Sequence, residues 1–444
     1  MNGEGSRVGE LLRAAYGVDP ALVALADEVI RELPWPRRSL NSVTATNLGR
    51  ILSAARRLGL HESDLRDSTG YGYDDRARDL IDRFYAEAFQ AERALVRQQM
   101  VSGTHALAAA LFGCLRPGDE LLAATGTPYD TLLPVIAGAP GSLQEFGVSY
   151  RALRSGEGGE IDPEAVAAAV SPATRVVLIQ RSRGYDWRDS LSVAAIGRLI
   201  GAIKAARPNV ICLVDNCYGE FVEDREPPAV GADLIAGSLI KNPGGGLLTT
   251  GGYIAGRAHL VELAAARLTA PGIGAKVGSS TGFSRLAAQG LFMAPGVVAR
   301  SLEGMRFAAA YFGRLGFAVS PGPDDPRTDI IQAIRLETAE GMVAFCRGLQ
   351  RASPVDADVV PEPAPTPGYG DRVVMAGGTF IQGSSIELSA DGPLRPPFAI
   401  YLQGGLDFEH VVLACTVVAQ ELAEVGLVNL SELSRRPRWG RAGQ

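Results

Sequence analysis

Lysine is nearly absent from this sequence. Of its 43 basic residues only three are lysines, Lys204, Lys241 and Lys276, and the remainder are arginines. Such a bias reflects codon composition, so a lysine that remains has an increased chance of being needed for chemistry. Lys204 lies in a plain helix end and Lys276 in a glycine-rich loop. Lys241 differs from both, because it ends a short apolar run.

Other absences exclude whole classes of function. The chain of 444 residues has a net charge of −6 and no basic stripe, so we expect no nucleic-acid partner. No apolar run reaches membrane-spanning length, and the acidic start MNGEGSRVGE does not resemble a signal peptide. We therefore expect a cytoplasmic protein with no membrane contact.

Thiols and imidazoles are few and scattered. The cysteines form no C-x-x-C pair, and we predict that they are buried free thiols and form neither disulfides nor a zinc site. They are Cys114, Cys212, Cys217, Cys346 and Cys415. The four histidines are also dispersed, so no metal site is predicted.

Lys241 lies in the stretch 233–246, DLIAGSLIKNPGGG, which has the pattern of a buried strand that turns at once into a glycine-rich loop. Burial lowers the pKa of an amine because the charged form loses its hydration. A neutral amine is a nucleophile that can form a Schiff base. The plainer interpretation is a lysine that simply reaches solvent from a strand end.

Asp215 closes a second apolar run, Val210–Val214. Ligands bind at the carboxyl ends of the strands in open α/β sheets. A carboxylate there can hold a pyridinium nitrogen in its protonated state. Lys241 and Asp215 together are the pairing that enzymes dependent on pyridoxal phosphate (PLP) use. Asp215 alone could equally be a turn residue at the end of a strand.

A phosphate site is predicted where Ser102-Gly-Thr-His opens an alanine-rich helix that reaches Phe112. The free N–H groups of a helix N-terminus favour an anion. Gly103 and Thr104 are the predicted donors, and the hydroxyl of Ser238, three residues before Lys241, is a natural partner. An ordinary helix cap is the alternative interpretation.

Taken together, these segments resemble a known family. VDNCYGEF, AGSLIKNPGGG, TGGYIAG, RLTAPGIG and GTFIQGSSIELSADGPLR are similar to the methionine γ-lyase-like family, also called the aluminium-resistance family, from about Thr46 to about Leu427. The resemblance implies the α/β architecture of fold type I PLP enzymes. That architecture has a mainly parallel, seven-stranded-type sheet in a large domain and a small α+β C-terminal domain.

The predicted domains are a helical arm over residues 1–65, a PLP-binding domain over 66–300, a small domain over 301–430 and a tail over 431–444. We expect the arm to pack across a neighbouring subunit. The strand–helix–strand order up to Lys241 predicts a parallel sheet with right-handed crossovers. Thr379–Leu388 and Phe398–Gln403 are predicted strands of a small antiparallel sheet.

The resemblance also implies roles for residues that local pattern alone does not single out. Tyr129 matches the tyrosine that stacks on the cofactor ring, and its hydroxyl is a candidate general acid. Tyr73 and Arg78, with Tyr71 less well matched, correspond to residues that reach the phosphate in an adjacent subunit. A surface turn is the alternative for that loop. A homotetramer built from two dimers follows from the same resemblance.

Substrate contacts are predicted from two segments. Arg395 matches the arginine with which the related lyases bind the substrate α-carboxylate. Arg181 or Ser182 follows a predicted strand over Arg175–Ile179 and could touch the cofactor ring oxygen or the substrate, and both alternatives stay open.

The predicted activity is γ-elimination on a γ-substituted L-amino acid. The sequence does not identify the leaving group. A thiolate would define a methionine or cystathionine lyase, whereas a halide on an unsaturated side chain would leave an alkyne. β-Elimination, γ-replacement and transamination use the same cofactor residues, and the fold does not distinguish them. A non-catalytic or metal-tolerance protein is the alternative of another class, and the Lys241–Asp215 pair argues against it. A Rossmann dehydrogenase is disfavoured because no G-x-G-x-x-G follows the first strand.

Overall fold

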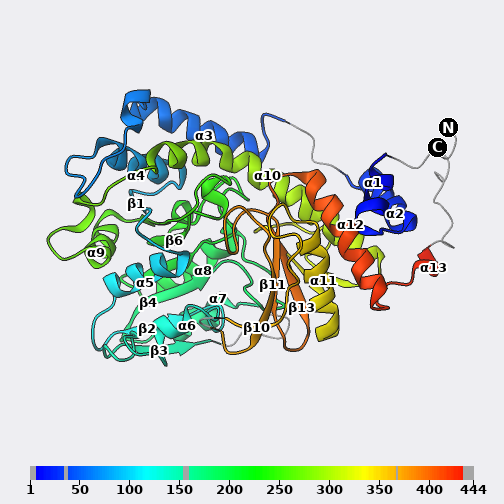
Figure 1. Cartoon of the computed structure of the whole chain (residues 1–444). Coiled ribbons are helices and arrows are strands. Elements are labelled where there is room, and N and C mark those ends of the chain that lie inside the picture. Colours follow the sequence, from blue (N-terminus) through cyan, green and yellow to red (C-terminus); the bar gives the residue numbers. More distant parts are fainter. Residues whose placement is uncertain (1–6, 35–38, 154–159, 367–368, 434–444) are drawn as a thin grey trace.

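The structure is a computed structural model that describes residues 7–34, 39–153, 160–366 and 369–433. It contains two β-sheets, each with its own helices and apolar core (Figure 1). The predicted tail lies mostly outside the described residues.

The larger sheet has seven strands in the order β1-β7-β6-β5-β4-β2-β3. Its strands are β1 (Arg93–Arg97), β2 (Glu120–Ala123), β3 (Ser149–Ala152), β4 (Thr174–Gln180), β5 (Ile211–Asp215), β6 (Leu234–Ser238) and β7 (Gly252–Gly256). Only β7 runs antiparallel to its neighbours, β1 and β6. The prediction of a mainly parallel sheet is therefore confirmed.

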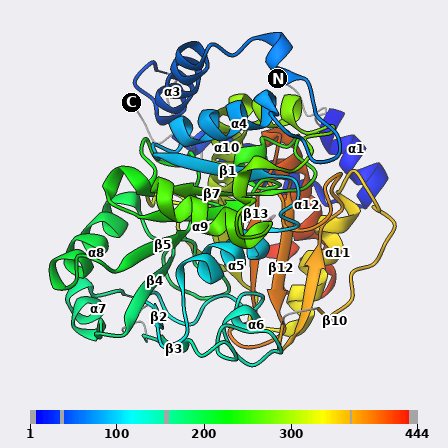
Figure 2. The same ribbon diagram turned by 90° about the vertical axis from the view of Figure 1, so that its left-hand side faces the viewer.

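Both faces of this sheet are covered, which explains why its strands are apolar throughout. In β4, Val177 and Ile179 belong to one core with α8 (Val193–Ala206), while Val176 and Leu178 belong to the core under α5 (Gly103–Cys114). Figure 2 shows α8 and α5 on opposite sides of the strands.

The second sheet has six antiparallel strands in the order β10-β11-β12-β13-β9-β8. They are β8 (Ala318–Ser320), β9 (Ile331–Arg335), β10 (Ala364–Pro365), β11 (Arg372–Ala376), β12 (Ser389–Pro393) and β13 (Ala399–Gln403). Helix α11 (Ala339–Arg351) packs on it, and α12 (Phe408–Glu424) packs on α11 in the same apolar core. This arrangement confirms the predicted antiparallel C-terminal sheet.

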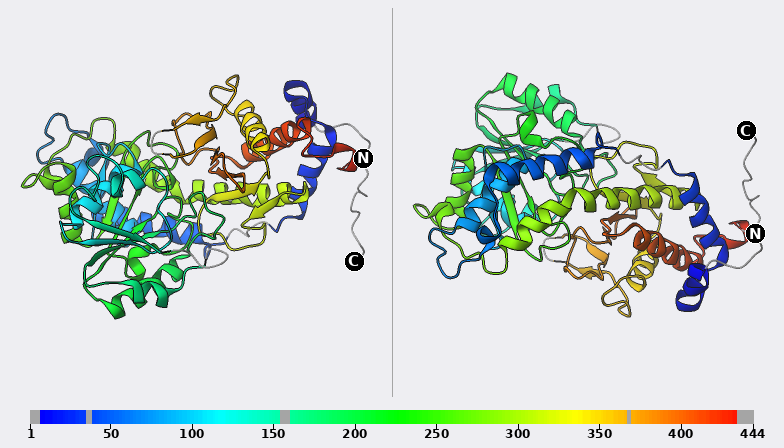
Figure 3. Two further views of the ribbon diagram at one scale, coloured as in Figure 1. Left: turned by 90° about the horizontal axis from the view of Figure 1, so that it is seen from below. Right: turned by 90° about the horizontal axis from the view of Figure 1, so that it is seen from above.

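Helix α10 (Ser284–Arg314) connects the two halves of the molecule and runs along both of them (Figure 3). The remaining α-helices are α1 (Arg7–Tyr16), α2 (Pro20–Glu32), α3 (Val43–Leu58), α4 (Arg76–Ala88), α6 (Leu133–Ile136), α7 (Pro163–Ala169), α9 (Ala258–Leu268) and α13 (Leu430–Leu433). Short 3-10 turns lie at Glu62–Leu65, Pro227–Val230, Asn242–Gly244 and Gly274–Lys276.

The predicted strand over Thr379–Leu388 is wrong. That segment is a loop, and the strand β12 begins only at Ser389. The Glu387 carboxylate accepts hydrogen bonds from the backbone N–H groups of Phe380 and Ile381. Side-chain bonds of this kind satisfy the backbone locally and compete with a sheet ladder.

The N-terminal arm also makes contacts within its own chain, and its predicted packing on a neighbouring subunit stays a prediction. Leu22, Leu25 and Val29 of α2 are buried within this chain, in the same core as helices α10 and α12. The Tyr311 hydroxyl of α10 donates to the carbonyl of Leu22 at 3.2 Å. Helix α2 therefore buries its apolar face within this chain, whereas Leu11, Leu40 and Leu52 of the predicted arm are exposed.

All five cysteines are buried free thiols, as predicted. Within the described ranges, no helix is both long enough and apolar enough to cross a membrane.

Candidate active site

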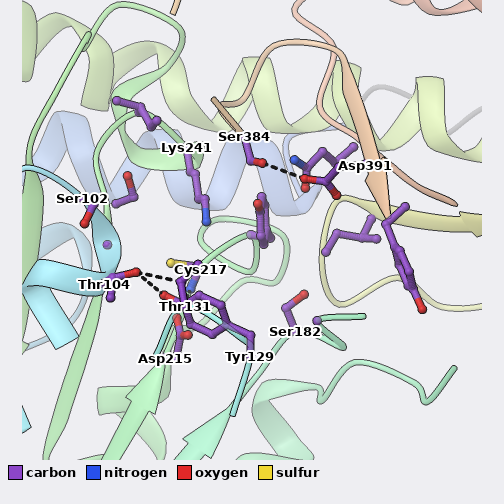
Figure 4. A pocket seen from close by; sticks show the side chains of 18 of the residues that line it. Ser102, Thr104, Tyr129, Thr131, Ser182, Asp215, Cys217, Lys241, Ser384 and Asp391 are labelled. Carbon is purple, nitrogen blue, oxygen red and sulfur yellow. Dashed lines mark hydrogen bonds between the residues drawn. The ribbon is translucent and has the colours of Figure 1, made fainter. Parts of the chain in front are cut away.

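A cavity of about 380 Å³ lies between the two sheets. Its floor consists of residues at the carboxyl ends of the parallel strands, where α/β proteins place ligands. Residues of β9, β12 and β13 close it from the side of the second sheet. Figure 4 shows the side chains that line it, with Lys241 near the middle.

Lys241 follows β6 and begins the turn Asn242–Gly244. Its Nζ lies 3.9 Å from the centre of the Tyr218 ring. Desolvation is the largest effect on the Lys241 pKa and lowers it, as the sequence predicted. Electrostatic interactions with Cys217, Tyr218, Tyr129 and Asp215 act in the opposite direction, and the Lys241 pKa is raised well above the ordinary value of a lysine. The expected depression of the pKa is thus corrected: in this arrangement the amine favours its charged form.

Asp215 ends β5, the parallel neighbour of β6. Its carboxylate is buried and accepts a hydrogen bond from the backbone N–H of Cys217 at 3.1 Å. Burial raises the pKa of Asp215, and the nearby Lys241 charge opposes this shift. Two adjacent strand ends therefore place the predicted amine and carboxylate in one cavity.

Tyr218 is held in the left-handed backbone region, with φ of 71°. This conformation is uncommon for a residue with a large side chain and is typical of functional sites. The Asn242 amide donates to the carbonyls of Tyr218 and Glu220, which ties the loop after β5 to the Lys241 turn. The family resemblance includes the segment VDNCYGEF, which contains Tyr218, but the sequence did not single out this residue.

The N-terminus of α5 faces the same cavity, as predicted. Ser102 caps the helix by accepting from the N–H of His105 at 3.1 Å, and Gly103, Thr104 and Ser238 line the cavity. A Cβ at position 103 would lie 3.2 Å from Cβ of Ser238 and 3.4 Å from Sγ of Cys217. Glycine thus permits the close approach of helix and strand, and the corner between them is of the kind in which helix N-termini favour an anion.

Tyr129 lies on the loop after β2 and is anchored by its N–H, which donates to Oε1 of Gln180 at 3.0 Å. Its hydroxyl lies 2.7 Å from Oγ1 of Thr104. Burial, together with Asp215 and Cys217, raises the Tyr129 pKa far above neutral pH, so the hydroxyl keeps its proton.

Comparison with known proteins agrees with this geometry. Residues 23–423 match the family described as methionine gamma-lyase. The chain belongs to this family. Enzymes of the family depend on PLP, and the recognition of the family, the fold type and the cofactor from the sequence is confirmed.

Three relatives illustrate the range of similarity. Protein YnbB of Bacillus subtilis is 48% identical over 407 residues, which cover 91% of this chain and 97% of YnbB. The structure of a carbon-sulfur lyase involved in aluminium resistance from Clostridium novyi NT has a TM-score of 0.88 at 41% identity and covers 95% of this chain and all of its own. L-methionine gamma-lyase of Pseudomonas putida is 32% identical over 165 residues, 37% of each chain.

The cavity fits PLP. Lys241 offers an amine inside it. Buried Asp215, which forms no salt bridge with any described residue, offers a carboxylate that can accept from a ring N–H. The corner at Gly103 and Ser238 offers hydrogen-bond donors for a phosphate. Tyr129 and Tyr218 are aromatic residues of the same cavity. This donor set matches what the family's cofactor requires of its protein.

Ser182 lines the cavity, and its hydroxyl donates to Asp329 at 2.8 Å. Arg181 does not line it. The Arg181 guanidinium is fully buried behind the site, where it donates to Asn216 at 2.8 Å and lies 3.7 Å from Glu226. The choice left open by the sequence is thereby corrected for Arg181, whose charge is paired with Glu223 and Glu226 outside the cavity. Ser182 is the member of the pair that faces the site.

Arg395 also lies outside the cavity lining. Its guanidinium donates to the Asp371 carboxylate at 2.7 Å, and both side chains are partly exposed. Among the cavity's described lining residues, Lys241 is the sole base. The predicted contact of Arg395 with a substrate carboxylate requires the side chain to leave Asp371 and stays a prediction.

Tyr73 and Arg78 lie away from the cavity of their own chain. Tyr73 is 70% exposed and stacks on Tyr71, with ring centres 5.5 Å apart. Arg78 is only 5% exposed, and its guanidinium donates to the carbonyls of Gly72 and Gly278. Arg78 therefore stabilises the loop that carries Tyr71 and Tyr73. A contact of Arg78 with a phosphate would require these hydrogen bonds to the carbonyls to break. Tyr73 remains accessible to a second subunit.

Several cavity residues escaped the sequence analysis. They come from loops and from the second sheet, and include Thr131, Tyr185, Tyr369, Ser384, Asp391, Tyr401 and Gln403. Asp391 could have been predicted from the sequence, because it is a charged residue inside the segment GTFIQGSSIELSADGPLR that carries the family resemblance.

Proposed function

We propose that this protein catalyses γ-elimination on a γ-substituted L-amino acid with PLP as cofactor. The observation that carries the proposal is the placement of Lys241 and Asp215 at the ends of adjacent parallel strands, facing one cavity beside the N-terminus of α5. The family supports the coarser statement that the chain is a PLP-dependent lyase.

When bound, PLP supplies a carbonyl carbon that reacts with amines and a protonated ring that stores an electron pair. Lys241 is the residue that would hold the cofactor covalently, and its amine, once freed, would take the proton from Cα of the substrate. Asp215 would keep the ring nitrogen protonated, since a buried carboxylate favours a cation as partner. Gly103, Thr104 and Ser238 would bind the phosphate.

Tyr129 is the proposed acid for the leaving group. Its hydroxyl keeps its proton at neutral pH and is oriented by Thr104 at 2.7 Å. Donation of this proton neutralises the departing substituent as its bond to Cγ breaks. Arg395 is proposed to bind the α-carboxylate, with Ser182 as a second polar contact.

Two products distinguish the chemistries that the cofactor residues allow. Elimination of a thiol from Cγ, followed by hydrolysis with one water molecule, gives a thiol, a 2-oxo acid and ammonia. Elimination of a halide from an unsaturated side chain releases halide and leaves an alkyne, and β-elimination releases the substituent of Cβ. We place the carbon–sulfur reaction first because the Clostridium novyi relative is described as a carbon-sulfur lyase.

The assembly is proposed to be a tetramer of two dimers. Tyr73 is exposed on a loop away from its own cavity, which is the arrangement needed for a contact with a neighbouring site. A dimer would then be the smallest active unit.

The decisive test is the visible absorption spectrum of the purified protein beside that of Lys241→Ala. We expect a band of lysine-bound PLP in the wild type, its loss in the variant and no 2-oxo acid release by the variant from γ-substituted amino acids. Lys276→Ala, which removes an exposed lysine, is the matched control and should keep both band and activity. A wild type that shows no band after incubation with PLP contradicts the proposal.

A further inference from the structure

Asp391 is a buried carboxylate on the substrate side of the cavity. It lies in the middle of β12 and lines the cavity wall formed by the second sheet. Ser384 donates a hydrogen bond to its Oδ2 at 3.1 Å. In Figure 4, Ser384 and Asp391 lie on the opposite side of Lys241 from Ser102 and Thr104. Asp391 is therefore remote from the proposed phosphate corner.

No salt bridge joins Asp391 to another described residue. Lys241 is the one basic residue among those that line the cavity in the described ranges, and its amine is assigned to the cofactor. Arg395 is engaged by Asp371. Burial raises the pKa of Asp391 to about 6, whereas hydrogen bonds from Ser384 and Tyr185 and the charge of Lys241 act in the opposite direction. A buried carboxylate without a cation is costly unless a ligand supplies a donor.

The parts of an amino-acid substrate differ in what they can place beside Asp391. The α-amino group is directed to the cofactor at Lys241. The α-carboxylate is an anion, and a second carboxylate nearby would repel it. The side chain beyond Cγ is the part that remains. Around Asp391 the wall is also polar, with Ser384, Tyr185 and Gln403 in the same lining.

We propose that Asp391 selects γ-substituted amino acids whose departing group carries a hydrogen-bond donor, an ammonium group above all. A purely apolar departing group, such as that of methionine, would desolvate the carboxylate without replacing its hydration. This inference rests on the proposed function, since γ-elimination defines the departing group. It adds the chemical class of that group and the residue that recognises it.

The test uses two probes that differ at one position. S-(2-aminoethyl)-L-homocysteine and S-propyl-L-homocysteine have the same number of heavy atoms, but the first ends in an ammonium group and the second in a methyl group. PLP-loaded enzyme is mixed with each probe. The dissociation constant is obtained from the initial spectral change, and kcat/KM from 2-oxo acid release. We expect the wild type to favour the aminoethyl probe by about tenfold or more in both quantities.

Asp391→Asn keeps the shape of the side chain and an oxygen that can accept from Ser384. We expect it to bind PLP normally and to lose most of the preference, mainly through weaker binding of the aminoethyl probe. Asp358→Asn removes the same charge from an exposed position before β11 and should keep the wild-type ratio. These variants separate recognition by Asp391 from a general change in charge.

Three further results would contradict either the role of Asp391 or the proposed function. A wild type that favours the propyl probe, or binds neither probe, overturns the inference even if Asp391→Asn fails to fold. An unchanged ratio in a PLP-loaded, active Asp391→Asn enzyme also overturns it and leaves the proposed function intact. Absence of the PLP band in the wild type overturns the proposed function itself.

Discussion

Glu220 is a buried acid just behind the candidate site. Its carboxyl accepts a hydrogen bond from the Tyr253 hydroxyl at 2.6 Å, and its other oxygen has no hydrogen-bond partner among the described residues. Its backbone carbonyl accepts from the Asn242 amide next to Lys241. Burial is the main cause that raises the Glu220 pKa to about 8, partly opposed by the bond from Tyr253. Near neutral pH this residue therefore holds a proton inside the fold.

Glu220 makes stability depend on pH in a defined direction. The folded-state pKa lies above the ordinary value of 4.5, so the folded protein binds a proton that the unfolded chain releases between these values. The contribution is complete below about pH 4.5 and is lost as pH rises through about 8. We expect the free energy of unfolding to decline by at most about 1.4 kcal/mol per pH unit in this window.

Glu220→Gln isolates this effect, because the amide can accept from Tyr253 and does not titrate. Urea unfolding of both proteins between pH 5 and pH 8 is the measurement. The difference between wild type and variant should shift in favour of the variant as pH rises. A difference that is independent of pH would show that Glu220 is ionised in the folded state.

At the scale of elements, the Lys241 turn is fixed by the backbone of α10. A Cβ at Gly290 would lie 2.4 Å from the carbonyl oxygen of Gly244, and one at Gly245 would lie 2.4 Å from the carbonyl oxygen of Gly290. The helix and the glycine-rich turn are therefore in direct backbone contact. This contact explains the glycine at position 245, whereas a Cβ at Gly244 would meet the carbonyl oxygen of Leu239 and one at Gly246 the side chain of Leu406.

Gly290→Ala should push α10 away from the turn. We expect a loss of about 1–3 kcal/mol in stability, typical of an overpacked core, and weaker retention of PLP. Gly296→Ala in the same helix is the control, because a Cβ there meets nothing within 4 Å. That variant should be neutral or more stable by about 0.5–1 kcal/mol. Thermal unfolding and PLP dissociation check both, and equal behaviour of the two variants would contradict the role of the contact.

The success of sequence prediction also varied by element. Strands β4, β5 and β6 were predictable because they are short apolar runs followed by polar residues, and both of their faces are covered. The boundary of β12 was not, because the interactions that decide it are the side-chain bonds of Glu387 to the preceding loop. Hydrophobic pattern alone carries no signal for such bonds.

At the scale of the whole molecule, the sequence does not predict which residues of the second sheet line the cavity between the two sheets. Lys241, Asp215 and the α5 corner belong to one sheet, whose strand order brings their ends together by a general rule. Asp391 and Ser384 come from the other half of the chain, and periodicity does not determine which face of the second sheet turns toward the cavity. Arg181 shows the same limit, since only the three-dimensional packing reveals that it points away from the cavity toward Glu226.

The assembly can be tested through the exposed loop that carries Tyr73. If Tyr73 serves the site of a neighbouring subunit, Tyr73→Ala should lower kcat/KM by about tenfold or more, a loss typical of one removed phosphate or positioning contact. Lys241→Ala should be inactive.

Co-expressed in one cell, the two variants form mixed dimers in which one site has both its own Lys241 and an intact Tyr73 from the partner subunit. We therefore expect the mixture to recover part of the wild-type kcat/KM, above the sum of the separate variants. Leu52→Ala, which alters an exposed apolar residue on α3, is the control variant to compare with Tyr73→Ala. It should keep full activity when expressed alone. Activity no higher than that sum, with mixed dimers demonstrated by differently tagged subunits, would mean that Tyr73 does not act across the interface and that each site is complete within one chain.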